Sequence, residues 1–387
     1  MSENLKKLTG KFGFEPIVQH LINNCDIALF KELVESDSFL FDFVKQNVAN
    51  RIAKVIDENN YKNLLEFLKY YSPFYEEVII SNLVKYADED LTDLMLDKFE
   101  NGTNDEKTYA AKYFGYIQDP LSLDFLRTNA YSDDDYLARN CAISLASWND
   151  EQSYNEAIKK LENNDDFEKL SAVKFLTSYG KKEALNAIIL AMKNSAMAEN
   201  IAGEIPYLED IFNILDSNFE NGLLVLNFII NGLGEILPLS TAIDYELFEV
   251  FERLINNYND SKSAIVLLNA KEKFETLTEN DEYLFDENKE TKNEIQDINK
   301  LLKNVDKKDL SKFVNEELNE NSPLVFTALD FASDLLAIRE LLKSDNQTLI
   351  LKTAEVLKKL NNLDETAKTI ALLKVTDVNI KSIIRAL

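Results

Sequence analysis

Apolar residues recur every 31 residues over a long stretch of this chain, and this period constrains the fold more than any other feature. One such row, which serves as an anchor, consists of Ile52, Leu83, Phe114, Leu145 and Leu176. Rows of the same spacing that begin at Val55, Leu64 and Leu68 are also apolar at every step. Periods of about 20–50 residues are typical of proteins that stack one supersecondary unit many times. The sequence therefore predicts a repeat array, ungapped from about Val44 to Asn194.

Two further rows indicate how each unit is built. Four residues before the anchor, the row is small or apolar and consists of Val48, Ile79, Ala110, Cys141 and Ala172. Five residues after the anchor, the row consists of Asp57, Asp88, Asp119, Asp150 and Lys181. An Asp just past one helix can cap the next by accepting hydrogen bonds from its free N–H groups. Each unit is thus predicted to contain a helix A, a short turn marked by Asp, and a helix B.

Composition favours helices and argues against several classes of partner. Gly (9) and Pro (6) are scarce in 387 residues, whereas a sheet protein of this size needs many turns marked by them. The formal net charge of −26 disfavours nucleic acids and anionic membranes, which bind basic faces. Two distant cysteines, Cys25 and Cys141, form no disulfide framework and fit a reducing compartment. With no apolar signal segment at the start, we expect an all-α, cytoplasmic protein.

Three segments of the repeat resemble a known family. They are TYAAKYFGYIQDPLSLDFL (108–126), RNCAISLASWNDEQSYNEAIKKL (139–161) and LSAVKFLTSYGKKEALNAIILAM (170–192). Their paired small residues and turn Asp resemble HEAT repeats of the short type named after the phycobilisome lyases. The resemblance implies an armadillo-like, right-handed α-α superhelix. Arg139 occupies a position where that family often has an Arg facing the turn Asp, but the equivalents Gln46, Glu77, Thr108 and Leu170 do not. A ladder of such pairs is therefore not expected.

The period divides the chain into five parts. We predict an N-terminal helical cap (1–43), five HEAT-like repeats (44–196) and longer, degenerate helical pairs (197–278). An acidic linker or irregular helix (279–305) and C-terminal repeats with a capping helix (306–387) follow. Within the third part, helices are expected near 207–216, 221–237, 242–258 and 260–277. The third and fourth parts can either continue the array or form an insert.

No constellation of residues in the sequence predicts catalysis, a metal site or a cofactor. The single histidine, His20, has no Cys or carboxylate at the spacing of a zinc site and is interpreted as a surface or packing residue. Cys141 and Trp148 lie in rows of core residues, so packing is their expected role. The run Asp133, Asp134 and Asp135 lacks the further ligands that calcium needs, and a capping loop is the better interpretation.

The remaining candidate is a surface on helix B, which lines the concave face in HEAT-type arrays. The residues predicted to form it are Asp93, Asp97, Asp124, Thr128, Tyr131, Asn155 and Lys159. The first hypothesis is a non-enzymatic scaffold that holds a protein or peptide partner there. The resemblance also leaves open a lyase or chaperone subunit that handles a bilin or another prosthetic group. A DNA-repair glycosylase is a third alternative, which the negative charge disfavours. An ordinary solvated face is the competing interpretation of the surface itself.

Overall fold

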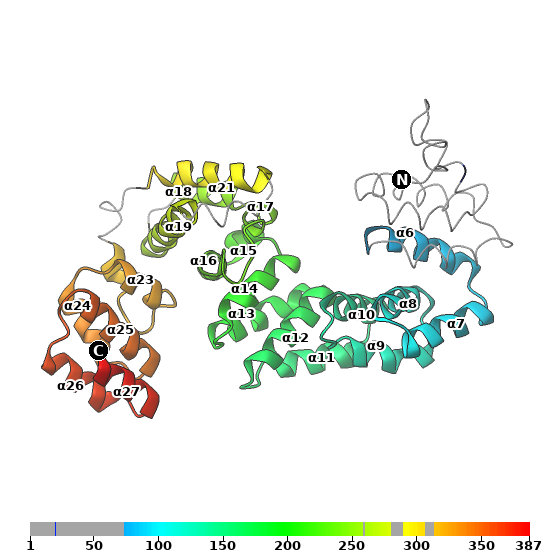
Figure 1. Ribbon diagram of the computed structural model, residues 1–387, viewed down its shortest axis with the longest axis horizontal. Coiled ribbons are helices and arrows are strands. Elements are labelled where there is room, and N and C mark those ends of the chain that lie inside the picture. Colours follow the sequence, from blue (N-terminus) through cyan, green and yellow to red (C-terminus); the bar gives the residue numbers. More distant parts are fainter. Residues whose placement is uncertain (1–19, 21–72, 258–259, 280–288, 306–312) are drawn as a thin grey trace, which may run out of the picture. The chain divides into compact units, whose positions relative to one another are not determined.

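The computed structural model describes His20 and residues 73–257, 260–279, 289–305 and 313–387 (Figure 1). These residues form helices and no β-strand, with one isolated bridge between Leu233 and Leu237, so the all-α class is confirmed for them. The predicted cap (1–43), apart from the half-buried His20, and the first repeat unit up to residue 72 lie outside the described residues. By its contacts the chain divides into two compact units. Unit 1 comprises residues 1–159 and 174–180, and unit 2 comprises 160–173 and 181–387.

Unit 1 consists of short helices that follow the predicted spacing. In order they are α6 (Pro73–Leu83), α7 (Glu89–Asn101), α8 (Asn104–Ile117), α9 (Leu123–Asn129), α10 (Asp135–Ser147) and α11 (Glu151–Lys160), with the second half of α12 (Asp166–Tyr179). The A helices α8, α10 and α12 begin at residues 104, 135 and 166, which are 31 apart. The B helices repeat the step, since α7 begins at 89, the 3₁₀ turn leading into α9 at 120, and α11 at 151.

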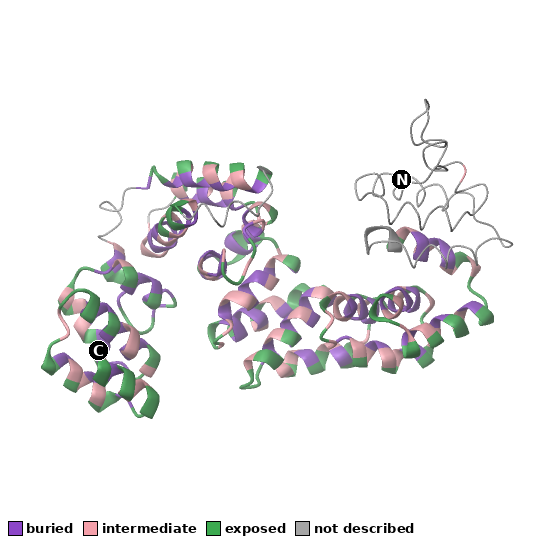
Figure 2. Ribbon diagram, in the orientation of Figure 1, coloured by how far each residue is buried: buried purple, intermediate pink, exposed green. Residues whose placement is uncertain are grey.

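The rows that define the period form the core. All four described residues of the anchor row, Leu83, Phe114, Leu145 and Leu176, are fully buried. The rows that run through Ala110, Met95 and Phe99 are likewise buried at every described position (Figure 2). The row three residues after the anchor differs, because Tyr86, Ile117 and Trp148 are only half-buried at the ends of their helices, whereas Tyr179 is buried at the end of α12. The period thus identifies the core correctly, and this row is the least buried of those described.

The turn aspartates act as helix caps. Asp88 Oδ1 accepts a hydrogen bond of 2.8 Å from the backbone N–H of Leu91 at the start of α7. Asp119 accepts one of 2.8 Å from Leu121 N, and Asp150 accepts one of 2.6 Å from Ser153 Oγ. Lys181, at the next step of the row, makes no side-chain capping bond. The capping prediction is confirmed for Asp88 and Asp119, and Asp150 bonds to a side chain of the helix that it precedes.

Adjacent A helices approach closely where the small residues lie. A Cβ added to Gly115 on α8 would lie 2.8 Å from Ser144 Oγ on α10, closer than atoms normally pack. The Ser144 hydroxyl donates to the carbonyl of Ala111 at 2.8 Å, and the indole Nε1–H of Trp148 donates to that of Phe114 at 2.8 Å. Trp148 is therefore part of the packing between α8 and α10, as predicted.

Unit 2 contains more varied helices. They are α13 (Leu185–Lys193), α14 (Ala198–Glu204), α15 (Ile211–Ser217), α16 (Phe219–Gly232), α17 (Thr241–Asp244), α18 (Leu247–Asn257), α19 (Ser261–Glu279), α21 (Lys289–Leu302), α23 (Val325–Phe331), α24 (Leu335–Glu340), α25 (Gln347–Lys359), α26 (Glu365–Lys374) and α27 (Val378–Ala386). The first half of α12 also belongs to this unit. In the described ranges, no helix has the length and apolar character needed to cross a membrane.

Three expectations for unit 2 need correction. The helix expected at 221–237 ends at Gly232, because the N–H groups of Ile236 and Leu237 both turn back to its carbonyl at 2.9 Å. The helix expected at 242–258 is interrupted between α17 and α18, where Glu246 has a φ of 51°. Within 279–305, residues 289–302 form a regular helix, α21, which packs against α18 and α19. The helix expected at 260–277 is confirmed as α19.

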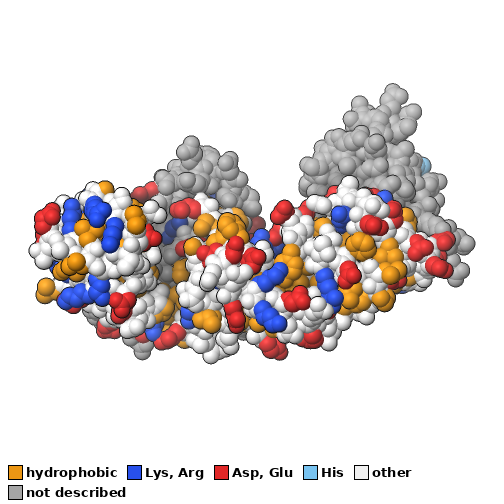
Figure 3. Space-filling view, turned by 90° about the horizontal axis from the view of Figure 1, so that it is seen from below, with side chains coloured by type: hydrophobic (Ala, Val, Ile, Leu, Met, Phe, Trp, Pro, Cys, Tyr) orange, Lys and Arg blue, Asp and Glu red, His pale blue; other side chains and the backbone are white. Residues whose placement is uncertain are grey.

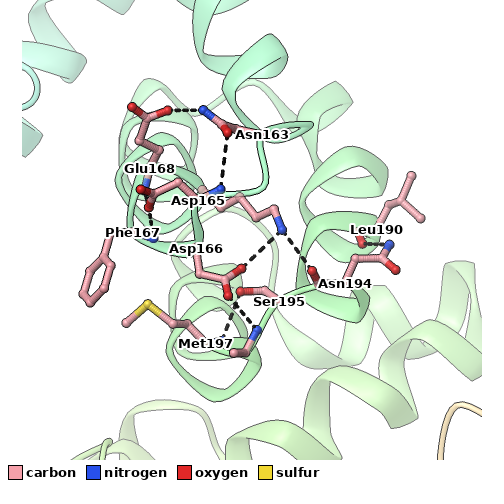
Figure 4. Close-up of polar contacts among 11 residues, drawn as sticks. Asn163, Asp165, Asp166, Phe167, Glu168, Leu190, Asn194, Ser195 and Met197 are labelled. Carbon is pink, nitrogen blue, oxygen red and sulfur yellow. Dashed lines mark hydrogen bonds and ion pairs between the residues drawn. The ribbon is translucent and has the colours of Figure 1, made fainter. Parts of the chain in front are cut away.

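Polar contacts join helices of unit 2, and two groups of them illustrate how. The side chain of Asn269 on α19 donates to Asn227 Oδ1 at 3.0 Å and Asn231 Oδ1 at 2.7 Å, both on α16. Asn227, which is buried, in turn donates to Thr327 Oγ1 on α23 at 3.0 Å. Near the start of α12, the buried Lys169 Nζ lies 3.2 Å from Asp166 Oδ1 and 2.9 Å from the carbonyl of Asn194 (Figure 4). The second contact fastens the turn after α13 to α12.

Candidate functional site

Six of the seven residues predicted on helix B are exposed, and they occupy equivalent positions on three successive B helices. Asp93 and Asp97 on α7, Asp124 and Thr128 on α9, and Asn155 and Lys159 on α11 are all exposed. Each helix buries the residue midway between its two members of this set, which is Met95 on α7, Leu126 on α9 and Ala157 on α11. Helical periodicity therefore turns the six residues away from the core. We call these six residues the helix-B face.

Tyr131 is the exception. It is half-buried, and its ring stacks on that of Phe175 with centroids 5.5 Å apart and planes inclined by 10°. Burial raises the pKa of its hydroxyl to about 12, with a further rise from the charge of Glu156. The structural reason is that α9 ends at Asn129, so the helical register no longer applies two residues later. Tyr131 belongs to the packing of unit 1.

The charges beside the helix-B face leave it acidic. Lys98 on α7 pairs with Glu106 at 2.6 Å, and Arg127 on α9 makes two hydrogen bonds, of 3.0 and 2.7 Å, to the carboxylate of Asp150. These cations are thus neutralised by carboxylates outside the face. Within the described ranges, Asp93, Asp97 and Asp124 form no ion pair, although Asp97 accepts a 3.0 Å hydrogen bond from Asn101. Lys159 supplies the one positive charge among the six residues.

Apolar side chains are exposed on the same helical segments. Leu94 on α7 is 39% exposed, and Leu121, in the turn before α9, is 70% exposed. Figure 3 shows the side on which α7, α9 and α11 lie in Figure 1, with hydrophobic side chains next to acidic ones. Burial of a few apolar side chains inside a charged rim is the usual composition of a protein–protein interface.

The other residues singled out in the sequence have structural contacts. Asp134 caps α10 by accepting from Leu137 N at 2.9 Å, and it also accepts from Asn104 Nδ2 at 3.0 Å. Asp135 pairs with Arg139 and with Lys174, each at 2.7 Å. Cys141 is fully buried, and burial raises the pKa of its thiol far above the ordinary value, so it is unsuited to act as a nucleophile. In the part of the chain that the structure describes, no group of His, Cys, Asp or Glu could hold a metal ion.

One kind of ion pair was not anticipated from the sequence. Arg127 on α9 binds Asp150, which precedes α11, and Arg339 on α24 binds Asp364 at 2.7 Å, which caps α26. In both pairs the Arg lies on one helix and the Asp lies just before a later helix, whereas the sequence drew attention to Arg139 on helix A. The sequence feature that could have predicted these pairs is an Arg that stands 23 or 25 residues before a turn Asp.

Burial alone would raise the pKa of Asp150, but the hydrogen bonds from Arg127 and Ser153 outweigh it. The net pKa of this carboxyl lies below its ordinary value, so it is ionised at neutral pH and holds Arg127 in place. Arg127, which lies beside the helix-B face, is therefore held by Asp150 in an internal ion pair.

No protein-family model matches this chain, and no curated protein shows significant similarity to it. The interpretation of the helix-B face consequently depends on its geometry and charge.

Proposed function

We propose that this protein is a non-enzymatic interaction scaffold whose helix-B face binds a basic segment of a protein or peptide partner. The supporting observation is the set of three exposed carboxylates on α7 and α9, Asp93, Asp97 and Asp124. Lys98 and Arg127, on the same helices, are held in ion pairs with Glu106 and Asp150, and the three carboxylates form no ion pair within the described ranges. A surface of one charge sign attracts a partner of opposite sign and steers its approach.

As part of the same proposal, the units of the repeat stack as a HEAT-like, right-handed superhelix with the B helices on the concave side. The regular step of 31 residues between helix starts supports this arrangement. A concave surface would present the carboxylates of successive units to one extended partner. Leu94 and Leu121 would add apolar contacts, which exposed charges alone do not supply.

The proposal is tested by capturing partners with the full chain and identifying them by mass spectrometry. The test variant carries Asp93→Lys, Asp97→Lys and Asp124→Lys. The matched control carries Glu272→Lys, Glu275→Lys and Glu355→Lys, which change the net charge equally at exposed positions within helices of unit 2.

The proposal predicts a partner that binds the wild type and the control and is lost with the test variant. Cross-links from that partner should fall on α7, α9 and α11. Retention of every partner by the test variant would show that the binding surface lies elsewhere. Equal loss with the control would show that only the overall negative charge matters.

A further inference from the structure

Unit 2 contains a cleft of about 470 Å³ beside α15 and α17. Its aromatic lining is formed by Tyr207, Phe212 and Tyr245, and its carboxylates are Asp210, Asp244 and Glu246. The helices α14, α15 and α17 around it are drawn in green in Figure 1. A volume of this size falls within the range of about 300–1,000 Å³ that is usual for pockets of small ligands. None of these residues belongs to the helix-B face.

Tyr245 fixes the inner wall of the cleft. Its hydroxyl donates a 2.6 Å hydrogen bond to the carbonyl of Gly203 on α14, and its ring lines the cleft. Burial raises the pKa of this hydroxyl, and Tyr207, Glu204 and Asp244 raise it further. The side chain is thus a neutral phenol, with the carboxylates of Glu204 and Asp244 close enough to act on it. Negative charges this close would also stabilise a cation placed in the cleft.

The carboxylates that line the cleft form no ion pair within the described ranges. Asp210 is used as the cap of α15, where it accepts from Asn213 N at 2.8 Å. Asp244 and Glu246 are exposed and form no ion pair within the described ranges. The basic residues nearby serve carboxylates that do not line the cleft. Lys182 pairs with Glu209 at 2.7 Å, and Arg253 pairs with Asp216.

The cleft has exposed aromatic surface that could meet a cation. Tyr207 is 65% exposed, although an aromatic ring normally gains by burial. Phe212 already has the guanidinium carbon of Arg253 at 5.9 Å from its ring centroid, which is a cation–π contact within this same region. Glu246 has a φ of 51°, a left-handed conformation that costs free energy in a residue other than glycine.

We propose that the cleft binds an alkylammonium group, with the rings of Tyr207 and Tyr245 against the cation and Asp244 and Glu246 as its counter-charge. An ammonium suits this site better than a guanidinium, since it is a compact charge that separate carboxylates can share. A planar guanidinium prefers a bidentate partner. The group can be supplied by a lysine side chain or by a free amine, and the probes below separate these sources.

The test uses the full chain with ¹³C-labelled tyrosine rings, observed by NMR during three titrations. The probes are Nα-acetyl-lysine N-methylamide, its Nζ-acetylated counterpart, which lacks the charge, and n-butylammonium. Both charged probes should shift the signals of Tyr207 and Tyr245 saturably, and the Nζ-acetylated probe should not. Tighter binding of the lysine derivative identifies a polypeptide source, and equal binding identifies a free amine. Equal shifts with the uncharged probe would overturn the proposal.

A matched pair of variants tests the counter-charge. Asp244→Asn with Glu246→Gln should weaken binding of the charged probes about tenfold. Glu272→Gln with Glu275→Gln removes the same charge from exposed positions on α19 and should leave binding unchanged. Equal weakening by both pairs would show that binding follows net charge alone and would overturn the proposal. Charge reversal at Asp93, Asp97 and Asp124 should not affect these shifts, so this test and that of the proposed function fail independently.

Discussion

Unit 1 and the α16–α19–α23 part of unit 2 hold their helices together in different ways. In unit 1 the same positions recur in each repeat, and small residues let α8 and α10 approach until Ser144 and Trp148 bond to backbone carbonyls of α8. In unit 2 a cluster of the buried Asn227 with the half-buried Asn231 and Asn269 joins α16 to α19 and extends to α23. In unit 1 the contacts that fix how helices pack are thus spread over equivalent positions of the repeat. In this part of unit 2 the asparagine cluster fixes the packing of three helices at one place.

The largest effect should come from overpacking the A helices of unit 1. We expect Ala110→Leu to lower the free energy of unfolding of this unit by about 1–3 kcal/mol, because Ala110 is fully buried in the small row. Gly115→Leu should act in the same direction, partly offset by the better helix propensity of Leu. Fluorescence of Trp148, the single tryptophan, reports unfolding of unit 1 in urea. Ala386→Leu, at an exposed position, is the control, and an equal effect there would refute the small-row assignment.

The asparagine cluster should respond almost as strongly. Asn269→Ala removes the donor to two carbonyl oxygens, so the buried Asn227 keeps an unsatisfied acceptor. We expect a loss of about 1–2 kcal/mol, measured as faster hydrogen exchange of the α16 and α19 amides. Asn293→Ala on the exposed side of α21 is the matched control. If the α16 and α19 amides exchange at the same rate in both variants, the cluster does not stabilise unit 2. The proposed difference between the two regions in how their helices are held together would then be wrong.

A smaller effect is expected at the turn caps. Asp88→Ala removes the side-chain acceptor at the start of α7 and should cost about 1 kcal/mol. Glu89→Ala, one residue later and exposed, removes a charge of the same sign without removing the cap. Urea unfolding followed by Trp148 fluorescence compares the two. Equal costs would mean that the row of aspartates acts through charge alone.

The smallest effect concerns the Arg127–Asp150 pair and its dependence on pH. The pKa of Asp150 is lowered from 3.8, so its contribution is complete above that value and disappears as the pH falls through the lower folded-state pKa. We expect the contribution to be below about 1 kcal/mol, because Arg127 is partly exposed. Unfolding of the wild type and Asp150→Asn should therefore differ at pH 6 and converge near pH 2. A difference that stays constant with pH would contradict the ion pair.

The features that could be predicted from the sequence are those that recur. The buried rows and the caps Asp88 and Asp119 must be of one residue class in each unit, so their period is visible in the chain. Asn227 and Asn231 lie within the helix expected at 221–237, yet nothing in the sequence indicated that Asn269 and Thr327 complete the cluster. The cleft could not be predicted either, because Tyr207 and Tyr245 are brought together by α14 and α17 without any shared spacing.

The helix-B face was predicted where helices are regular and missed where they stop. Asp93 to Lys159 keep their register along α7, α9 and α11, whereas Tyr131 follows the end of α9 and turns inward. The pair of Arg127 and Asp150 was missed because a long side chain can reach a carboxylate that no helical spacing relates to it. Buried positions within a helix are therefore easier to predict from the sequence than contacts between side chains of different helices.

The central claim is that the 31-residue period separates core positions from the exposed helix-B face. The most direct measurement is the rate of thiol labelling in a chain whose two natural cysteines are replaced by alanine. Single cysteines are then placed at Asp124, Leu126 and Thr128 on α9, and at Asn155, Ala157 and Lys159 on α11. The account predicts fast, slow and fast labelling along each helix, since Leu126 and Ala157 are fully buried. Labelling at similar rates at all three positions of either helix would contradict it.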